Sequence, residues 1–144
     1  IYIEKFYESY PKVKLYLEKT IASCEEKKYV ETMFWRKRYI NGINDLNKIV
    51  KSSAEREATN MPIQWTSADI IKIAMIQVHK YMLNHKLKSK MIMQVHDELV
   101  FDVFPWEEVE LKREVQKIMQ NIIKDSQIEL KVDIWEWNTW KEAK

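Results

Sequence analysis

The sequence predicts an α+β fold in which an antiparallel β-hairpin packs against several long helices. Residues 3–28 and 107–124 carry apolar side chains at spacings of three and four, which is typical of amphipathic helices. Two short apolar runs, 91–95 and 99–104, flank a tight polar link and favour a hairpin. Because the elements do not alternate as βαβ units, a parallel-sheet class is not favoured.

Composition sets broad limits on this chain of 144 residues, which is 46% hydrophobic and has a formal net charge of +2. We expect one domain with a real core, and the small charge neither requires nor excludes a nucleic-acid partner. Cys24 is alone, so an internal disulfide is excluded and a reducing, cytoplasmic location is expected. No apolar run approaches the roughly 20 residues of a membrane helix, so no membrane partner is expected.

The first predicted element is a helix over residues 3–28, with Pro11 marking a kink or a break into two helices. Residues 29–51 have no regular period and include a polar loop around Gly42. The apolar stripe of this first element consists of Phe6, Tyr10, Val13, Leu17 and Ile21.

Two helices are expected next. Residues 52–60 contain strong helix formers and end before Pro62. Thr66 or Ser67 is then expected to cap a second helix that runs to about His85. Its apolar stripe consists of Ile70, Ile73, Ala74, Val78 and Tyr81.

The C-terminal part of the sequence predicts the hairpin, a helix and a strand. In the hairpin, residues 96–98 form the link between the two apolar runs. The helix covers residues 107–124, and the strand covers residues 128–134, where apolar and polar side chains alternate. The inward face of the helix consists of Leu111, Val115, Ile118 and Ile122.

The hairpin link carries the side chains with the most chemistry: His96, Asp97 and Glu98. Mg²⁺ prefers oxygen ligands and usually takes only one or two carboxylates from a protein. A hairpin is a rigid mount for such a ligand. Acidic residues are also common in ordinary polar turns. The spacing alone therefore leaves a metal ligand and a plain turn both open.

Four segments in the same order resemble DNA polymerase family A, the DNA polymerase I type. Residues 94–102 (QVHDELVFD) are similar to the third motif of that family. Residues 54–75 resemble its AER-A-N-PIQGTAADIIKLAM stretch, and residues 29–39 resemble its GYVETL-GRRR-Y segment. Residues 130–144 resemble its terminal VD-G-G-W-AK. Together the four segments span most of the chain.

The resemblance implies the C-terminal part of a polymerase palm and template-directed DNA synthesis by two-metal nucleotidyl transfer. Asp97 matches an aspartate that ligates Mg²⁺, and Glu98 matches a neighbouring acid with a supporting role. His96 matches a residue near the primer terminus that could help to position the sugar. The catalytic residues implied are thus Asp97, Glu98 and His96.

The resemblance also implies duplex contacts. Arg56, Asn60 and Gln64 match residues that touch primer–template DNA, together with His96. Arginine pairs with phosphate, and amides can donate to minor-groove acceptors present at every correct base pair. Without the resemblance, Arg56 is equally well a surface charge. Lys72 is better explained as part of a solvated helix face. The basic cluster 36–38 could approach the DNA backbone, but as an isolated run it is better explained as surface.

Two parts of the family site are expected outside residues 1–144: the first motif, with a second metal-binding aspartate, and the helix that grips the triphosphate. The chain alone is therefore expected to be inactive. Its expected partners are primer–template DNA, dNTP and the rest of the polymerase chain.

Two other functions stay open at this point. One is a non-catalytic remnant that binds duplex DNA. The other is a metal-dependent hydrolase, which would need further ligands such as His79 and His85, although their spacing of six places them on different faces of a helix.

Glycine is scarce in this chain, which has one glycine and six tryptophans, whereas an average composition would give about ten glycines. The family resemblance places glycine where this sequence has Trp35, Trp65, Trp135 and Trp137. Trp140 matches a family tryptophan, and Trp106 stays ambiguous. Either these residues are true tryptophans, or the gene uses a code in which UGA specifies glycine.

Overall fold

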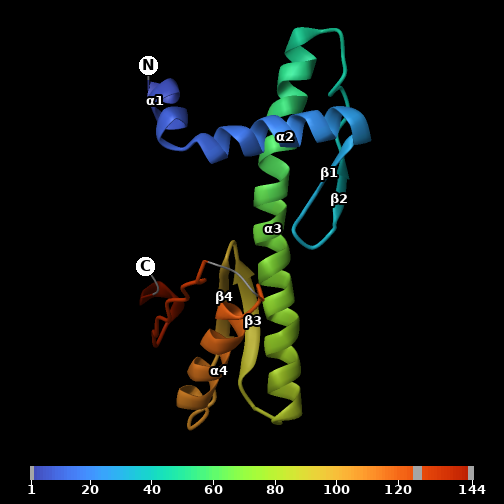
Figure 1. Ribbon diagram of the computed structural model, residues 1–144. Coiled ribbons are helices and arrows are strands. Elements are labelled where there is room, and N and C mark those ends of the chain that lie inside the picture. Colours follow the sequence, from blue (N-terminus) through green and yellow to red (C-terminus); the bar gives the residue numbers. More distant parts are fainter. Residues whose placement is uncertain (1, 125–127, 143–144) are drawn as a thin grey trace. The chain divides into compact units, whose positions relative to one another are not determined.

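The computed structural model describes residues 2–124 and 128–142 and confirms the α+β class (Figure 1). The chain divides into two compact units, Ile1–Ser67 and Ala68–Lys144. Helix α3 contributes residues to both units. In the described part of the chain, no helix is long and apolar enough to cross a membrane.

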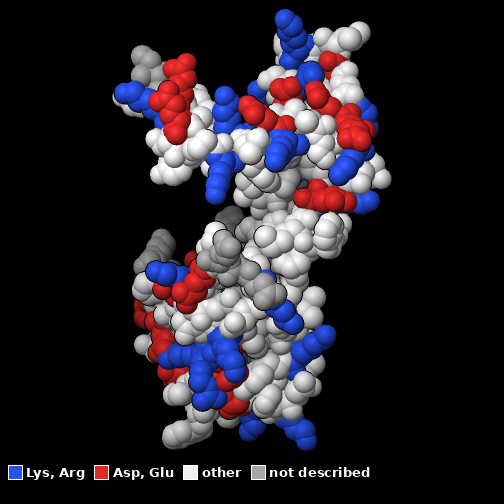
Figure 2. Space-filling model, viewed as in Figure 1, with Lys and Arg blue, Asp and Glu red and all other residues white. Residues whose placement is uncertain are grey.

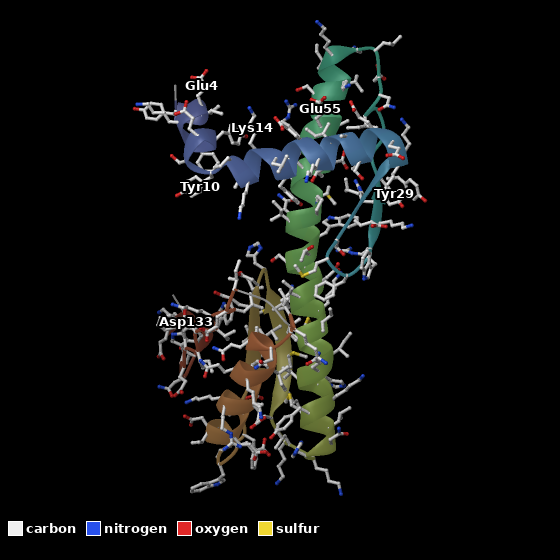
Figure 3. The ribbon with its side chains drawn as sticks, in the orientation of Figure 1. Glu4, Tyr10, Lys14, Tyr29, Glu55 and Asp133 are labelled. Atoms are coloured by element: carbon white, nitrogen blue, oxygen red, sulfur yellow. The ribbon has the colours of Figure 1, made fainter. Side chains whose placement is uncertain are left out.

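The first unit begins with helices α1 (Tyr2–Ser9) and α2 (Pro11–Lys27), so the predicted break at Pro11 is confirmed. Proline suits the first position of a helix because its missing N–H would have no partner there. Tyr10 lies at the bend between the helices, where its ring centroid is 5.1 Å from that of Phe6 (Figure 3). Much of the predicted apolar stripe is exposed, including Phe6, Tyr10 and Val13.

Two short strands follow, β1 (Tyr29–Glu31) and β2 (Lys37–Tyr39), in a region where the sequence predicts no regular structure. They pair antiparallel, with Val30 opposite Arg38. The core of this unit consists of Cys24, Val30, Ile40, Ile43, Ala54 and Ala58, with Met61 packed against it. Burial raises the pKa of the Cys24 thiol, because the thiolate is poorly solvated there.

Helix α3 (Lys48–Asn84) is one continuous helix, so the predicted break before Pro62 is wrong. Its N-cap is Asn47, whose Oδ1 accepts the N–H of Ile49 at 2.9 Å. Thr66, predicted as a cap, lies inside the helix, and its Oγ1 accepts the N–H of Met33 at 3.0 Å. Proline removes one hydrogen bond, but strong helix formers and buried positions on both sides of it, such as Ala58 and Ala74, favour continuation.

The predicted hairpin of the second unit is confirmed as strands β3 (Lys90–Val95) and β4 (Glu98–Asp102), paired antiparallel. Val95 pairs with Glu98, so Glu98 belongs to β4 and the link is shorter than predicted. The register shifts between Met91 and Met93, as in a β-bulge.

Helix α4 (Glu108–Gln120) ends before the predicted residue 124. Its Leu111 and Val115 join Val78 and Met82 of α3 in a second core. The side chains packed against that core are Leu87, Met91, Phe101, Ile118 and Met119. Figure 1 shows α4 and the C-terminal half of α3 next to the hairpin, whose Met91 and Phe101 pack against the core that the two helices share.

The strand predicted over residues 128–134 is wrong, because the described residues of this segment form no strand. Alternation of side chains is not sufficient, since a strand needs a hydrogen-bonded neighbour. The segment is instead joined to α4 by Gln116, whose Nε2 donates to the carbonyl of Val132 at 2.9 Å.

The base of the β3–β4 hairpin is joined to the start of α4 by Glu107. Its carboxylate accepts the N–H groups of Lys88 and Ser89, both at 2.8 Å, and the Ser89 hydroxyl at 2.6 Å. Ser89 Oγ in turn accepts the N–H of Phe104 at 2.9 Å. These donors, first the Lys88 N–H and then the Ser89 hydroxyl, lower the pKa of Glu107.

Candidate functional site

The tip of the β3–β4 hairpin is a turn of two residues, His96 and Asp97, between the paired residues Val95 and Glu98. Of the two turn residues only His96 has a positive φ, of 51°. A positive φ at the first turn position is typical of a type II′ hairpin turn, whose twist matches that of the strands. The tip is therefore set by backbone geometry and holds the three candidate side chains His96, Asp97 and Glu98 close together.

Gln94 supports this turn and was missed as a functional candidate by the sequence reasoning. Its Nε2 donates to the carbonyl oxygen of His96 at 2.8 Å. The bond fixes the peptide that joins His96 to Asp97. The signal was present in the sequence, because an amide two residues before a turn can reach the turn backbone.

The carboxylates of Asp97 and Glu98 are exposed, and within the described residues neither has a hydrogen-bond or ion-pair partner. Carboxylates without partners are suited to a cation. Across residues 2–124 and 128–142 there is no group of three His, Cys, Asp or Glu side chains that could hold a metal. The tip carries two exposed carboxylates, and Mg²⁺ usually takes one or two carboxylates from a protein.

Arg56, Asn60 and Gln64 form a second candidate surface on α3, in the first unit. They are four residues apart and exposed, so they lie along one face of the helix. Residues two positions apart on a helix point to nearly opposite sides, and Ala54 and Ala58 of the opposite face are buried in the core. The core therefore orients the polar face outward. Arg56 Nη1 donates to Ser52 Oγ at 3.1 Å, which extends its guanidinium along this face.

The basic cluster 36–38 is engaged inside its own unit. Arg36 lies 4.1 Å and Arg38 5.1 Å from the ring centroid of Trp65, both in cation–π geometry. Arg38 also pairs with Glu57 at 3.0 Å. Lys37 Nζ lies 4.5 Å from the ring of Tyr29, which Figure 3 labels on β1. All three side chains of the cluster therefore make contacts within the first unit.

Surface charge gives no single basic face in the view of Figure 2, where acidic and basic side chains are interspersed over each unit. Lys72 is exposed on α3, as a solvated position would be. Any attraction for nucleic acid in this part of the chain must therefore come from particular side chains rather than from bulk charge.

The two remaining histidines do not extend the hairpin tip into a metal centre. His79 is exposed on α3. The ring of His85 stacks on that of Tyr81, with centroids 4.0 Å apart, and its Nδ1 lies 2.9 Å from the Tyr81 carbonyl oxygen. The hydrolase alternative thus gains no further ligands among the described residues.

Proteins similar to this chain include DNA polymerases from several bacteria. Residues 1–142 match the family described as DNA polymerase family A. DNA polymerase I of Lactococcus lactis subsp. cremoris is 45% identical over 144 residues, covering 99% of this chain and 16% of that protein. DNA polymerase I of Caldicellulosiruptor bescii is 42% identical, covering 99% of this chain and 17% of that protein. The chain thus spans about one sixth of the length of these relatives.

A solved structure agrees with the sequence relatives. It is the POL domain of Pol1 from M. smegmatis in complex with DNA primer-template and dNTP. It superposes with a TM-score of 0.81 at 36% identity, covering 84% of this chain and 21% of that one. Residues 143 and 144, the last two of the segment 130–144 that resembles the family's terminal sequence, lie outside the described residues.

Proposed function

The chain belongs to DNA polymerase family A, and we propose that it is the C-terminal part of the palm of a longer polymerase that extends a primer on a DNA template. The observation that carries the proposal is the hairpin tip, where a two-residue turn presents Asp97 and Glu98 without partners among the described residues. The relative solved with primer-template and dNTP supports DNA and nucleotide as the ligands.

In this proposal, the primer 3′-oxygen attacks the α-phosphorus of the dNTP and pyrophosphate leaves. Such phosphoryl transfer depends on positioning and on neutralising negative charge rather than on covalent help from the protein. His96 lies beside Asp97 in the turn and can donate a hydrogen bond to the sugar of the primer terminus. Glu98 begins β4 and supports the tip with a second carboxylate.

Mg²⁺ would be held by the carboxylate of Asp97 together with ligands outside this chain. The donor chemistry fits, because the tip supplies exposed carboxylate oxygens, which Mg²⁺ prefers as ligands. Bound there, the ion would stabilise charge on the transferring phosphate. Since the rest of the ligand set and the triphosphate grip are expected elsewhere, we propose that the isolated chain does not extend a primer.

Duplex binding is assigned in this proposal to the polar face of α3. Arg56 suits a backbone phosphate, and Asn60 and Gln64 carry amides that can donate to the minor-groove acceptors N3 and O2. Because those acceptors occur at every base pair, this face would hold DNA without reading its sequence. The exposure of all three side chains supports the assignment.

The test is Asp97→Asn in the full-length protein that contains this chain, assayed by primer extension under single-turnover conditions. We expect the rate to fall on the order of 10³-fold, because losing a metal ligand removes several kcal/mol of transition-state stabilisation. The matched control is Asp102→Asn at the other end of β4, also an exposed aspartate, which should leave the rate within about twofold.

Each outcome separates the proposal from its rival. Primer binding that persists in Asp97→Asn while extension is lost supports the catalytic assignment. A wild-type protein that binds primer–template DNA and never extends it identifies a non-catalytic remnant instead. Extension by the purified 144-residue chain would contradict the proposed inactivity of the chain alone.

A further inference from the structure

Trp35 occupies a backbone position that favours glycine. It is the third residue of the three-residue loop 33–35 between β1 and β2, and its φ is 66°. Thr32 N–H donates to the Arg36 carbonyl at 2.9 Å and closes the loop, while Trp35 N–H donates to the Thr32 carbonyl at 3.0 Å. Loops of this kind end in a left-handed residue, which is ordinarily glycine because a Cβ is crowded there.

Trp106 occupies a second such position, in an unrelated turn. Residues 104–107 form a turn in which the Glu107 N–H donates to the Phe104 carbonyl at 3.1 Å. Pro105 is its second residue and Trp106, with a φ of 78°, is its third. A positive φ at the third position defines a type II turn, in which proline followed by glycine is the favoured pair. A bulky side chain in this conformation is a genuine outlier.

Neither indole has a packing role that would compensate for the backbone conformation. Trp35 is 79% exposed and Trp106 is 97% exposed, whereas tryptophan is on average a highly buried residue. Positive φ alone does not identify positions that require glycine, since Lys28, Lys86 and His96 share it. Such positions are identified by the combination of a turn type that favours glycine with a largely exposed indole.

We propose that the native protein has glycine at positions 35 and 106, specified by UGA codons that the printed sequence renders as tryptophan. The same codon would then account for positions 65, 135 and 137, where the family resemblance also places glycine. Trp140 stays a true tryptophan, because the family resemblance has tryptophan there. Positive φ does not separate it from Trp65, Trp135 and Trp137, so the assignment of those three rests on the resemblance. The proposal assigns Trp106, which the sequence alone leaves ambiguous.

Glycine at position 65 would change the surface that this residue now covers. The indole of Trp65 stacks against the guanidinium groups of both Arg36 and Arg38, and without it both stacking contacts disappear. The bond from Arg36 Nη2 to the carbonyl of residue 65, at 3.2 Å, needs no side chain there and would persist. Glycine three residues after Pro62 would also weaken α3 at the point where the sequence predicts a break.

The direct test combines the codons of the locus with mass spectrometry of the protein purified from its source cells. Trypsin releases residues 29–36 with position 35, residues 91–112 with position 106, and residues 132–141 with positions 135, 137 and 140. We expect UGA at the first four of these positions and UGG at 140. The first two peptides should each carry one glycine, and the third should carry two glycines and one tryptophan.

Two results of this test overturn the proposal. UGG codons at positions 35 and 106 would make both residues ordinary tryptophans. UGA codons with tryptophan masses in the peptides would show that UGA is read as tryptophan in the source. The third peptide is its own control, because recoded and true tryptophan positions are then read in one spectrum.

A second measurement tests the backbone argument without the source organism. In the full-length protein, Trp35→Gly and Trp35→Ala both remove the indole, but only alanine keeps a Cβ in the left-handed region. Amide exchange within residues 29–36 should be roughly five- to thirty-fold slower in the glycine variant. The pair Trp106→Gly and Trp106→Ala should differ in the same direction. Equal protection within both pairs contradicts the assignment of these positions to glycine.

Discussion

The two hairpins of this chain differ in how their tips are held. The β1–β2 loop is fixed to α3, because Met33 N–H donates to Thr66 Oγ1 and Arg36 Nη2 donates to the carbonyl of Trp65. The β3–β4 tip has Asp97 and Glu98 exposed, without side-chain partners among the described residues. That second hairpin is instead held at its base, through Glu107.

The difference separates a tip with a structural role from the tip for which we propose a catalytic role. Where loop side chains satisfy backbone groups, as Thr32 does, substitution should cost stability. Where they point to solvent from a turn fixed by its backbone, as Asp97 does, substitution should cost activity and leave the fold intact. A rigid hairpin is a precise mount for a ligand, which agrees with the role we propose for the tip.

The largest expected stability effect is at Thr32, which is 6% exposed. Its Oγ1 accepts the N–H groups of Phe34 and Arg36, both at 3.2 Å, and Thr32→Val leaves both without that acceptor. We expect the opening free energy of this loop to fall by about 1–3 kcal/mol, measured by amide exchange within residues 29–36 of the full-length protein.

Two control variants sharpen that result. Thr59→Val removes a hydroxyl whose partners, among the described residues, are carbonyls of its own helix. Asp97→Asn changes a tip residue whose side chain has no partner in that part of the chain. In both variants the opening free energy measured by amide exchange should stay within about 0.5 kcal/mol of the parent value. If Asp97→Asn lowers the opening free energy as much as Thr32→Val does, the two tips do not differ in the way described above.

The base of the second hairpin is tested by pH. Because hydrogen bonds lower the pKa of Glu107, its contribution to stability is present above the ordinary value of 4.5 and is lost as pH falls through the lowered pKa. We expect Glu107→Gln to reduce protection of the amides of Lys88 and Ser89 at neutral pH and to remove their acid dependence. If the protection of these two amides still falls in acid in Glu107→Gln as it does in the parent, then other carboxylates cause that pH dependence.

A smaller effect is expected at the contact between α3 and α4, where the Tyr81 hydroxyl donates to Glu110 Oε1 at 2.6 Å. This bond raises the pKa of Tyr81 to about 12. Its contribution is complete below the ordinary pKa of 10.0 and is lost as pH rises toward that raised value. Tyr81→Phe should lower the free energy of unfolding by about 0.5–1.5 kcal/mol, measured in urea at neutral pH. In this variant the free energy of unfolding should also decrease less as the pH rises toward the raised pKa.

The smallest stability effect is expected at His96. Glycine is the favoured first residue of a type II′ turn, so His96→Gly should change stability by less than about 1 kcal/mol, in the stabilising direction. If the imidazole positions the primer terminus, the same variant should still raise the KM for primer–template DNA. A stability loss in this variant would show that the side chain, and not only the backbone, holds the turn.

Parts of the fold followed from the sequence because their signals are local. Pro11 broke the first helix as predicted, and the apolar runs around residues 96–98 formed the predicted hairpin. The continuity of α3 did not follow, because burial on both sides of Pro62 outweighs the cost of one proline. The β1–β2 hairpin was missed because its strands are short and its loop lacks the glycine that usually marks such a turn.

The candidate site was predicted from the residue identities of the segment 94–102, which resemble a family motif, and not from the spacing of its acidic residues. Asp97 and Glu98 by themselves fit an ordinary turn, and only the family resemblance assigns them a metal. The position of Gln94 two residues before the turn makes its support of the turn possible, but the backbone group that its amide contacts depends on the position of one carbonyl. The engagement of Arg36 and Arg38 by Trp65 likewise depends on tertiary contacts that no local pattern contains.

The burial of Cys24 has a practical consequence. It is the single thiol of these 144 residues and is 0% exposed in the core of the first unit. A thiol-reactive fluorophore can reach it only when that core opens, so its labelling rate reports the frequency of local opening. The rest of the described surface, being free of thiols, is open to single engineered cysteines whose labelling would be read against this slow internal standard.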